Sequence, residues 1–185
     1  MKRLLIVLAV LTAACGGGAA ATTTTSTTPT TLPQSDLLTY TSQDLGFSIE
    51  YPATWVVSED IKGGIVSFTN NPSQPGPAGT MNVVVGTIPA QIFPLDYYAN
   101  EIERMKRALP DLQVLEDTQL AIQGLPARAI SGTAVQGGVQ VALARIIVLR
   151  ERRAYEITFL TTGSTMGNEE AMVRQLLQSF RFTAP

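Results

Sequence analysis

This sequence of 185 residues contains no histidine and a single cysteine, Cys15. The absence of histidine removes the commonest metal ligand and the commonest general base of enzymes. One cysteine cannot form a disulfide within the chain. Lysine is scarce too, since only Lys62 and Lys106 follow Cys15. The usual nucleophile–base pairs and transition-metal sites therefore lack their side chains, and the sequence predicts no enzyme, no required cofactor and no metal site.

Charged side chains make up only 15% of the residues, and acidic ones are in excess. Asp and Glu number 15 and Lys and Arg 13, which gives a formal net charge of −2. Without Lys2 and Arg3, which precede the first apolar run, 11 basic residues face 15 acidic ones. Nucleic acid is disfavoured as a partner, because phosphates must be neutralised by a basic face. A hydrophobic share of 45% suits a folded core and rules out a wholly disordered chain.

The N-terminal apolar run, from Leu4 to Leu11, has eight residues, too few for a helix to cross a bilayer core of ~30 Å. Two basic residues precede it and small residues lead from it to Cys15, an order typical of a secretory signal peptide. The small residues before the cysteine resemble the bacterial lipobox. We therefore predict a lipoprotein signal peptide over residues 1–14 and lipidation of Cys15. An ordinary cleaved signal peptide followed by an incidental cysteine is the alternative.

Residues 15–35 are of low complexity, and eight of the ten residues from Thr22 to Thr31 are threonine. They have no apolar periodicity that could offset the entropy of ordering them. We predict a flexible tether behind the lipidated cysteine, either an unmodified spacer or an O-glycosylated stalk. The tether would hold one folded domain, residues 36–185, at the extracytoplasmic face of the cell membrane.

Alternating apolar residues predict short strands in the first part of this domain. In the clearest one, Phe47, Ile49 and Tyr51 share a face and Pro52 ends the strand. Further strands are predicted over residues 55–57, 65–68 and 81–88, and a proline- and glycine-rich loop over residues 70–80.

Helical spacing then takes over between Pro94 and Pro110. Five apolar residues recur every three or four positions and are predicted to form the buried side of a helix. They are Leu95, Tyr98, Ile102, Met105 and Leu109. The carboxylates of this helix, Glu101 and Glu103, stand two positions apart and do not face each other, so they are predicted to be solvated.

The second part of the domain predicts strands over residues 112–122, 126–136, 139–150 and 155–159 and a helix near the C-terminus. Gly137-Gly138 is a hairpin turn signal. Four strands and a helix, followed by four strands and a helix, indicate an α+β fold. In such a fold, helices pack on a mostly antiparallel sheet.

At this point the chain resembles PsbP-like domains. The stretch from Asp44 to Pro52 followed by Trp55 looks like their opening. The segments 124–128 and 155–159 and a last helix ending at residues 179–182 match in the same order, so the resemblance covers nearly all of residues 40–183. It implies an α/β/α sandwich around a central antiparallel sheet. It also implies docking to a membrane complex and, for the photosystem II protein, support of calcium and chloride retention.

Arg150, Arg152 and Arg153 with Glu151 form the one dense basic spot. It is either a solvated hairpin tip or a contact for anionic lipid headgroups or an acidic partner. The sequence thus predicts a monomeric, lipid-anchored PsbP-like binding module, an accessory or assembly factor of a membrane protein complex with an unknown protein partner. A photosystem II-type role and calcium binding follow only from the resemblance. The alternative is a carrier of a small hydrophobic ligand or lipid, which a large enclosed apolar pocket would favour over a solid core.

Overall fold

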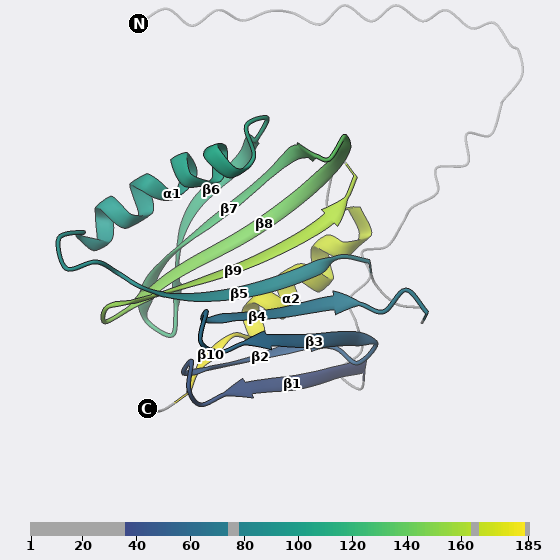
Figure 1. Cartoon of the computed structure of the whole chain (residues 1–185), viewed down its shortest axis with the longest axis horizontal. Helices are drawn as coiled ribbons and strands as arrows, with labels where there is room; N and C mark the ends of the chain where they lie inside the picture. The colour runs from purple at the N-terminus through teal and green to yellow at the C-terminus, as the bar shows by residue number, and fades with distance from the viewer. Residues whose placement is uncertain (1–35, 74–77, 164–166, 184–185) are drawn as a thin grey trace, which may run out of the picture.

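The computed structural model describes residues 36–73, 78–163 and 167–183. The predicted signal peptide (1–14) and tether (15–35) lie outside these residues. The elements are β1 (Leu37–Ser42), β2 (Phe47–Pro52), β3 (Trp55–Asp60), β4 (Ile65–Asn70), β5 (Thr80–Thr87), α1 (Pro94–Ala108), β6 (Gln113–Ile122), β7 (Leu125–Gln136), β8 (Val139–Arg150), β9 (Arg153–Thr162), a short 3-10 turn (Gly167–Glu169), α2 (Glu170–Ser179) and β10 (Arg181–Phe182). Figure 1 shows them in chain order.

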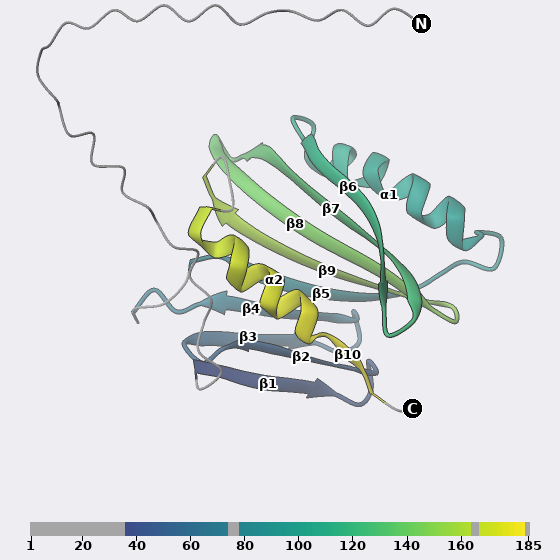
Figure 2. The ribbon, with the colours of Figure 1, turned by 180° about the vertical axis from the view of Figure 1, so that it is seen from behind.

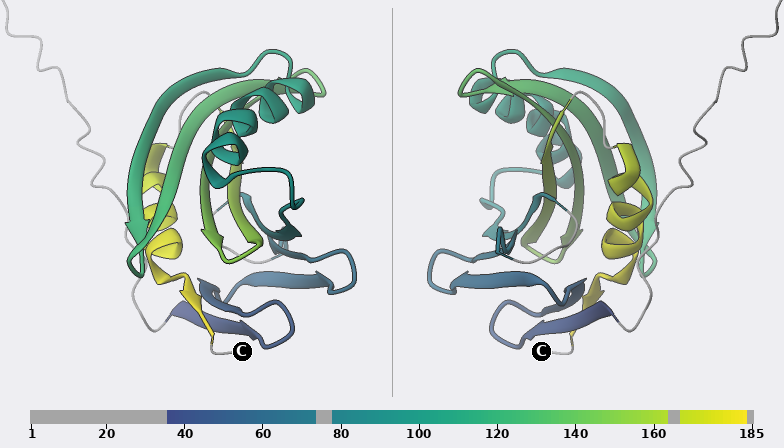
Figure 3. Two further views of the ribbon diagram at one scale, coloured as in Figure 1. Left: turned by 90° about the vertical axis from the view of Figure 1, so that its left-hand side faces the viewer. Right: turned by 90° about the vertical axis from the view of Figure 1, so that its right-hand side faces the viewer.

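The strands form two sheets. The larger sheet has seven strands in the order β3-β4-β5-β9-β8-β7-β6, and the smaller has three in the order β1-β2-β10. Every pair in both sheets is antiparallel. Helix α1 lies on one face of the large sheet, and α2 and the small sheet lie on the other (Figures 2 and 3). The α+β class and the helix-covered, antiparallel sheet predicted from the sequence are therefore confirmed.

Each face of the large sheet has its own packed core. On the α2 side, aromatic side chains from both sheets and from the residue that follows α2 are fully buried. These are Phe47, Phe68, Phe159 and Phe180. On the α1 side, Tyr97 and Met105 pack over alternate residues of β7 and β8, among them Ile130, Leu143 and Ile147. Strand β8 contributes side chains to both cores, so both of its faces are buried. Such a strand needs a nearly continuous apolar run, and β8 has one.

The order of elements differs from the predicted one at both ends of the domain. Strand β1 was not predicted, because it has no clear alternation of apolar and polar residues and its Leu38 is exposed. Residues 181–182, which the sequence placed at the end of the last helix, instead leave the helix and pair with β2. The backbone turns extended at Phe180, the residue that follows α2 (ψ 130°).

Helix α1 has the predicted extent and most of the predicted buried side, since every residue of the predicted apolar set except Leu95 packs against the core. It starts with Pro94 and ends at Ala108, two residues before Pro110. Its side chains that face the sheet are Tyr97, Glu101 and Met105, four positions apart, whereas Leu95 is 80% exposed. The helix is therefore rotated enough to expose Leu95 and bury Glu101, while the rest of the predicted apolar side stays against the core. The reason is a buried charge, described below. Among the residues that the structure describes, no helix is long and apolar enough to cross a membrane.

This rotation gives opposite expectations for two apolar residues of α1. Met105→Ala should lower the free energy of unfolding by about 2–5 kcal/mol, because it empties a buried site. Leu95→Ala should change it by less than about 0.5 kcal/mol, because the side chain contacts mostly solvent. Urea unfolding followed by circular dichroism measures both. Equal losses at the two positions would contradict the observed orientation.

Candidate functional site

A groove of about 560 Å³ lies between α2 and the β6–β8 part of the large sheet. Its floor consists of small side chains: Ser131 of β7 stands opposite Ala144 of β8, and Thr133 opposite Ala142. Ala129 continues this floor along β7. Small residues keep the sheet surface low beside α2, so space remains where larger side chains would have filled the core.

Apolar side chains form the two walls of the groove. Helix α2 contributes Val173 and Leu177, and β6 contributes Leu115 and Leu120. Leu115 is 66% exposed and stands at an irregularity in the pairing of β6 with β7. A bulge of this kind turns a side chain out of the regular alternation. The groove is thus an apolar surface that remains open to solvent rather than an enclosed cavity.

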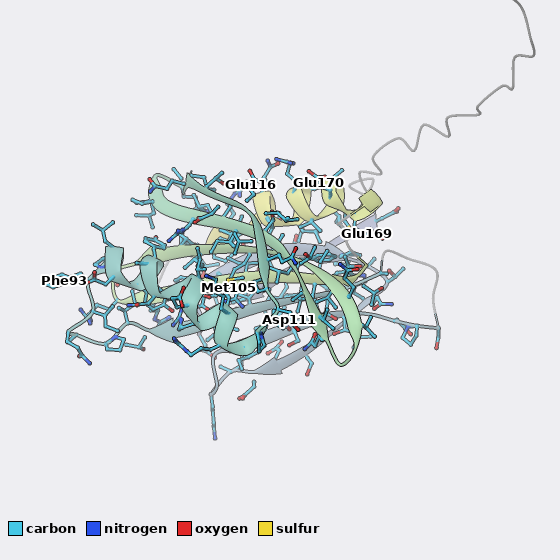
Figure 4. The ribbon with its side chains drawn as sticks, turned by 90° about the horizontal axis from the view of Figure 1, so that it is seen from above. Phe93, Met105, Asp111, Glu116, Glu169 and Glu170 are labelled. Atoms are coloured by element: carbon cyan, nitrogen blue, oxygen red, sulfur yellow. The ribbon has the colours of Figure 1, made fainter. Side chains whose placement is uncertain are left out.

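Charged residues stand at the rim. Glu116 of β6 and Glu170 at the start of α2 both line the groove, and Figure 4 shows the two at the same side of the molecule. Arg174 also lines it and pairs with Glu170 at 3.1 Å, with both side chains about two-thirds exposed. Exposed pairs of this type contribute little to stability. A bound molecule could therefore replace the Arg174–Glu170 pair with its own polar contacts at little cost in the stability of the fold.

The opposite face carries a network of buried charges beneath α1. The Glu101 carboxylate has no exposed surface and accepts hydrogen bonds from Arg104, with Nε at 2.7 Å, and from Arg145 of β8. Arg104 also donates to Glu156 of β9 at 2.7 Å. Arg145 Nε donates to Thr158 Oγ1 at 2.8 Å. Two carboxylates and two guanidinium groups thus compensate one another between the helix and the sheet.

Tyr97 completes this network, since its hydroxyl donates to Glu156 at 2.5 Å. Burial, and then this hydrogen bond, raise the pKa of the Tyr97 hydroxyl to about 12. Burial lowers the pKa of Arg104, but hydrogen bonding to Tyr97 and Glu101 and the charges of Glu101 and Glu156 outweigh it, so the pKa is raised overall. Each of these groups is held in its ordinary charge state, which suits positioning of α1 rather than proton transfer.

Glu101 corrects the prediction that both glutamates of α1 are solvated. Glu103 is indeed exposed and pairs with Lys106 at 3.4 Å, but Glu101 is wholly buried. The sequence held one sign of this, because Arg145 interrupts the apolar alternation of β8 on the face that α1 covers. A single partly buried arginine in an apolar strand needs an opposite charge nearby, and a carboxylate on the helix that covers the strand can supply it.

The three arginines of the predicted basic spot meet at the end of the molecule where β8 turns into β9. Arg150 donates to the carbonyl of Thr183 at 3.2 Å and lies over the Phe182 ring. Arg152 donates to the carbonyl of Ile88 at 2.6 Å. Arg150 therefore joins the β8–β9 turn to the C-terminal segment, and Arg152 joins it to the connection between β5 and α1.

Arg153 donates to the carbonyls of Asp44 and Leu45, both at 3.4 Å, and so fastens the same turn to the β1–β2 turn. Contact of the three arginines with a partner or with headgroups stays a prediction. Cys15 lies outside the described residues. Within residues 36–73, 78–163 and 167–183, no three His, Cys, Asp or Glu side chains come together in a way that could hold a metal ion.

Comparison with known proteins gives a family match. The model of the family described as PsbP-like protein matches residues 5–182. No curated protein sequence matches the chain significantly.

Several solved structures share the fold at low sequence identity. Cyanobacterial PsbP (CyanoP) from Synechocystis sp. PCC 6803 superposes with a TM-score of 0.58 at 16% identity, over 80% of this chain and 92% of that one. The Ran-binding protein Mog1p of Saccharomyces cerevisiae gives 0.61 at 6% identity, over 79% and 95%. LpqN, involved in cell envelope biogenesis of Mycobacterium tuberculosis, gives 0.54 at 14% identity, over 80% and 92%. At these identities the likeness concerns the fold alone.

Proposed function

This chain belongs to the PsbP-like family, and we propose that it is a lipid-anchored, extracytoplasmic binding module that serves as an accessory or assembly factor of a membrane protein complex. The observation that carries the proposal is the open apolar groove between α2 and strands β6–β8. We propose that an apolar segment of the partner protein lies in it, with polar groups of the partner over Glu116 and Arg174.

The solid packing of both cores supports a binding module rather than a carrier of a small ligand. Both cores contain fully buried, closely packed side chains, and the groove opens along the surface instead of enclosing its contents. An open groove presents its walls to a segment of another protein, as in the helix-in-groove mode of recognition. An enclosed pocket would suit a carried lipid better, because it removes more of the apolar chain from water.

One observation favours the second candidate, a carrier of a small hydrophobic ligand. The volume of about 560 Å³ falls within the usual range of small-molecule sites, roughly 300–1,000 Å³. The two functions use the same walls, so one substitution tests both.

We expect Ala144→Phe to block the groove by placing a ring on its floor. The protein should keep its stability to within about 1 kcal/mol, since the ring enters open space rather than a packed core. A photo-crosslinker in place of Leu177, in native membranes, should join the chain to a membrane protein, and Ala144→Phe should abolish that product. The control is Val56→Phe, which adds the same ring at an exposed site on β3.

Mass spectrometry of organic extracts of the purified protein tests the carrier. A lipid that co-purifies at one equivalent and is lost with Ala144→Phe, without any protein crosslink, would establish the carrier in place of the module. A Leu177 crosslink that survives Ala144→Phe would show that the groove is not the contact.

Lipid anchoring is tested at Cys15. Acyl chains stabilise membrane binding by ~0.8 kcal/mol per buried CH₂, so two or more chains hold a protein where one is marginal. Cys15→Ala should therefore move the protein from the membrane fraction to the soluble fraction or leave the precursor unprocessed. An unmodified mature N-terminus at another residue, found by mass spectrometry of the native protein, would contradict the anchor.

A photosystem II-type role is the weaker form of this proposal. The family's metal sites lean on histidine, which the sequence lacks. Docking in the photosystem protein uses basic side chains. After Cys15, this chain has only two lysines, Lys62 and Lys106. We propose no required cofactor, and calcium would need oxygen ligands from loops.

A further inference from the structure

Among the described residues, the two most exposed large apolar side chains are Phe93 and Leu95, which are separated in the chain by Pro94 alone. Phe93 is 73% exposed and Leu95 is 80% exposed. Figure 4 shows Phe93 at the extreme end of the molecule, away from the Glu170 end of α2. Both side chains are turned to solvent rather than packed in the core, so they are free to contact another surface.

This tip lies at the same end as the three arginines. The amide of Ile88, five residues before Phe93, donates to the carbonyl of Arg152 at 2.8 Å, and the Arg152 side chain returns a bond to the carbonyl of Ile88. The β8–β9 turn and the start of the β5–α1 connection are thus joined. The apolar pair thus follows a segment that is bonded to Arg152, and the pair and the guanidinium groups belong to the same end of the molecule. We call residues 93–95 and 150–153 the tip surface.

We infer that the tip surface docks on the lipid bilayer to which the chain is anchored, with Phe93 and Leu95 entering the boundary between headgroups and acyl chains. The inference rests on the lipid anchoring proposed above. Amphipathic surfaces of this kind bury their apolar side chains a few ångströms below the headgroups, while arginine contacts phosphate.

Charge and area favour a bilayer over a protein as the occupant. Residues 150–153 contain three arginines and Glu151, so the tip surface has a formal net charge of +2, which suits anionic headgroups, and the apolar pair supplies further attraction. Two projecting side chains cannot cover the ~1,000 Å² that a specific protein interface needs. They suffice at a membrane that already holds the chain, because an anchor makes docking intramolecular and raises the effective concentration.

The length of chain before the domain permits this orientation. Strand β1 runs from Leu37 to Ser42, and Ser42 lies next to the β1–β2 turn that Arg153 binds. The domain therefore begins one strand, about 20 Å, away from the tip surface. The 21 residues from Cys15 to residue 35 can span up to about 70 Å. The anchor and the tip surface can thus reach the same bilayer, with the groove beside α2 facing sideways.

A fluorescent label tests the docking independently of acylation. The mature chain, residues 15–185 with Cys15→Ser, is held on vesicles of phosphatidylethanolamine and phosphatidylglycerol by an N-terminal polyhistidine tag and a nickel-chelating lipid. Leu95→Cys then provides the only thiol, which carries a polarity-sensitive dye. We expect a blue shift of its emission on the vesicles and quenching by spin-labelled lipids. Adding Phe93→Ser should reduce both effects.

The matched control is the same dye at Val56→Cys, an exposed apolar site on β3 outside both the tip surface and the groove, which should keep its emission in water and escape quenching. Equal behaviour of the two labels, or no effect of Phe93→Ser, would overturn the inference. A label at residue 95 that changes only on native membranes, and not on pure lipid, would overturn it in favour of a protein contact. None of these results depends on whether Cys15 is acylated, which the N-terminal mass decides separately.

Discussion

Replacing Glu101 by leucine is expected to lower the free energy of unfolding by about 3 kcal/mol. Removing one partner of a buried ion pair typically costs ~3–5 kcal/mol, because the remaining charge is left uncompensated. The side chains of Arg104 and Arg145 are 40% and 22% exposed, so water relieves part of that cost. Denaturant unfolding of the mature protein measures the loss.

A second substitution separates the charge from the packing. Adding Arg145→Met to Glu101→Leu should recover much of the lost stability, since a buried pair can often be replaced by apolar residues without loss. Glu103→Gln on the same helix, where the carboxylate is exposed, should change stability by less than about 0.5 kcal/mol. If Glu101→Leu behaves like Glu103→Gln, the buried network does not hold α1 in place.

Phe47→Ala is expected to cost about 3–5 kcal/mol, the usual range for a buried phenylalanine. Phe47 has no exposed surface, and its ring lies 5.8 Å from that of Phe180 and 5.7 Å from that of Tyr40. It also stands opposite Phe182 in the β2–β10 pair. The substitution should therefore loosen the small sheet and α2 together.

Hydrogen exchange distinguishes this loosening from a general loss of stability. At equal denaturant, amide protection should fall most in β2, β10 and the last turn of α2. Val56→Ala on β3, at an exposed site, serves as the control and should change stability by less than about 0.5 kcal/mol. Protection lost evenly over both sheets would contradict a local role for Phe47.

The sequence predicted where α1 begins and ends and most of its buried side, but not that Leu95 is exposed and Glu101 buried. Local signals set its limits, namely Pro94 at the start and Pro110 after the end. The burial of Glu101 depends on Arg145, which is 44 residues further along the chain. The spacing of apolar residues cannot express a contact between two charges on different elements, so Leu95 was predicted to be inside and Glu101 outside.

The groove could not be predicted from the spacing of apolar residues either. Periodicity tells which face of a strand is buried but not what covers it. The alternation along β7 and β8 places three small residues on the face that α2 covers, yet these residues line the open groove. They are Ala129, Ser131 and Ala144. Only their small size hints at it, and small residues also occur where two backbones approach closely.

Strand β2 lies between the first and the last strands of the domain, and this has a consequence for how the chain folds. It pairs with β1 on one edge and with β10 on the other, and Phe47 opposes Phe182 across most of the length of the domain. Contacts between residues so distant in sequence form late and slowly. A chain emerging N-terminus first, from a ribosome or an export channel, can close its small sheet only when nearly all of it is out. The small sheet is therefore the last part of the domain that can form.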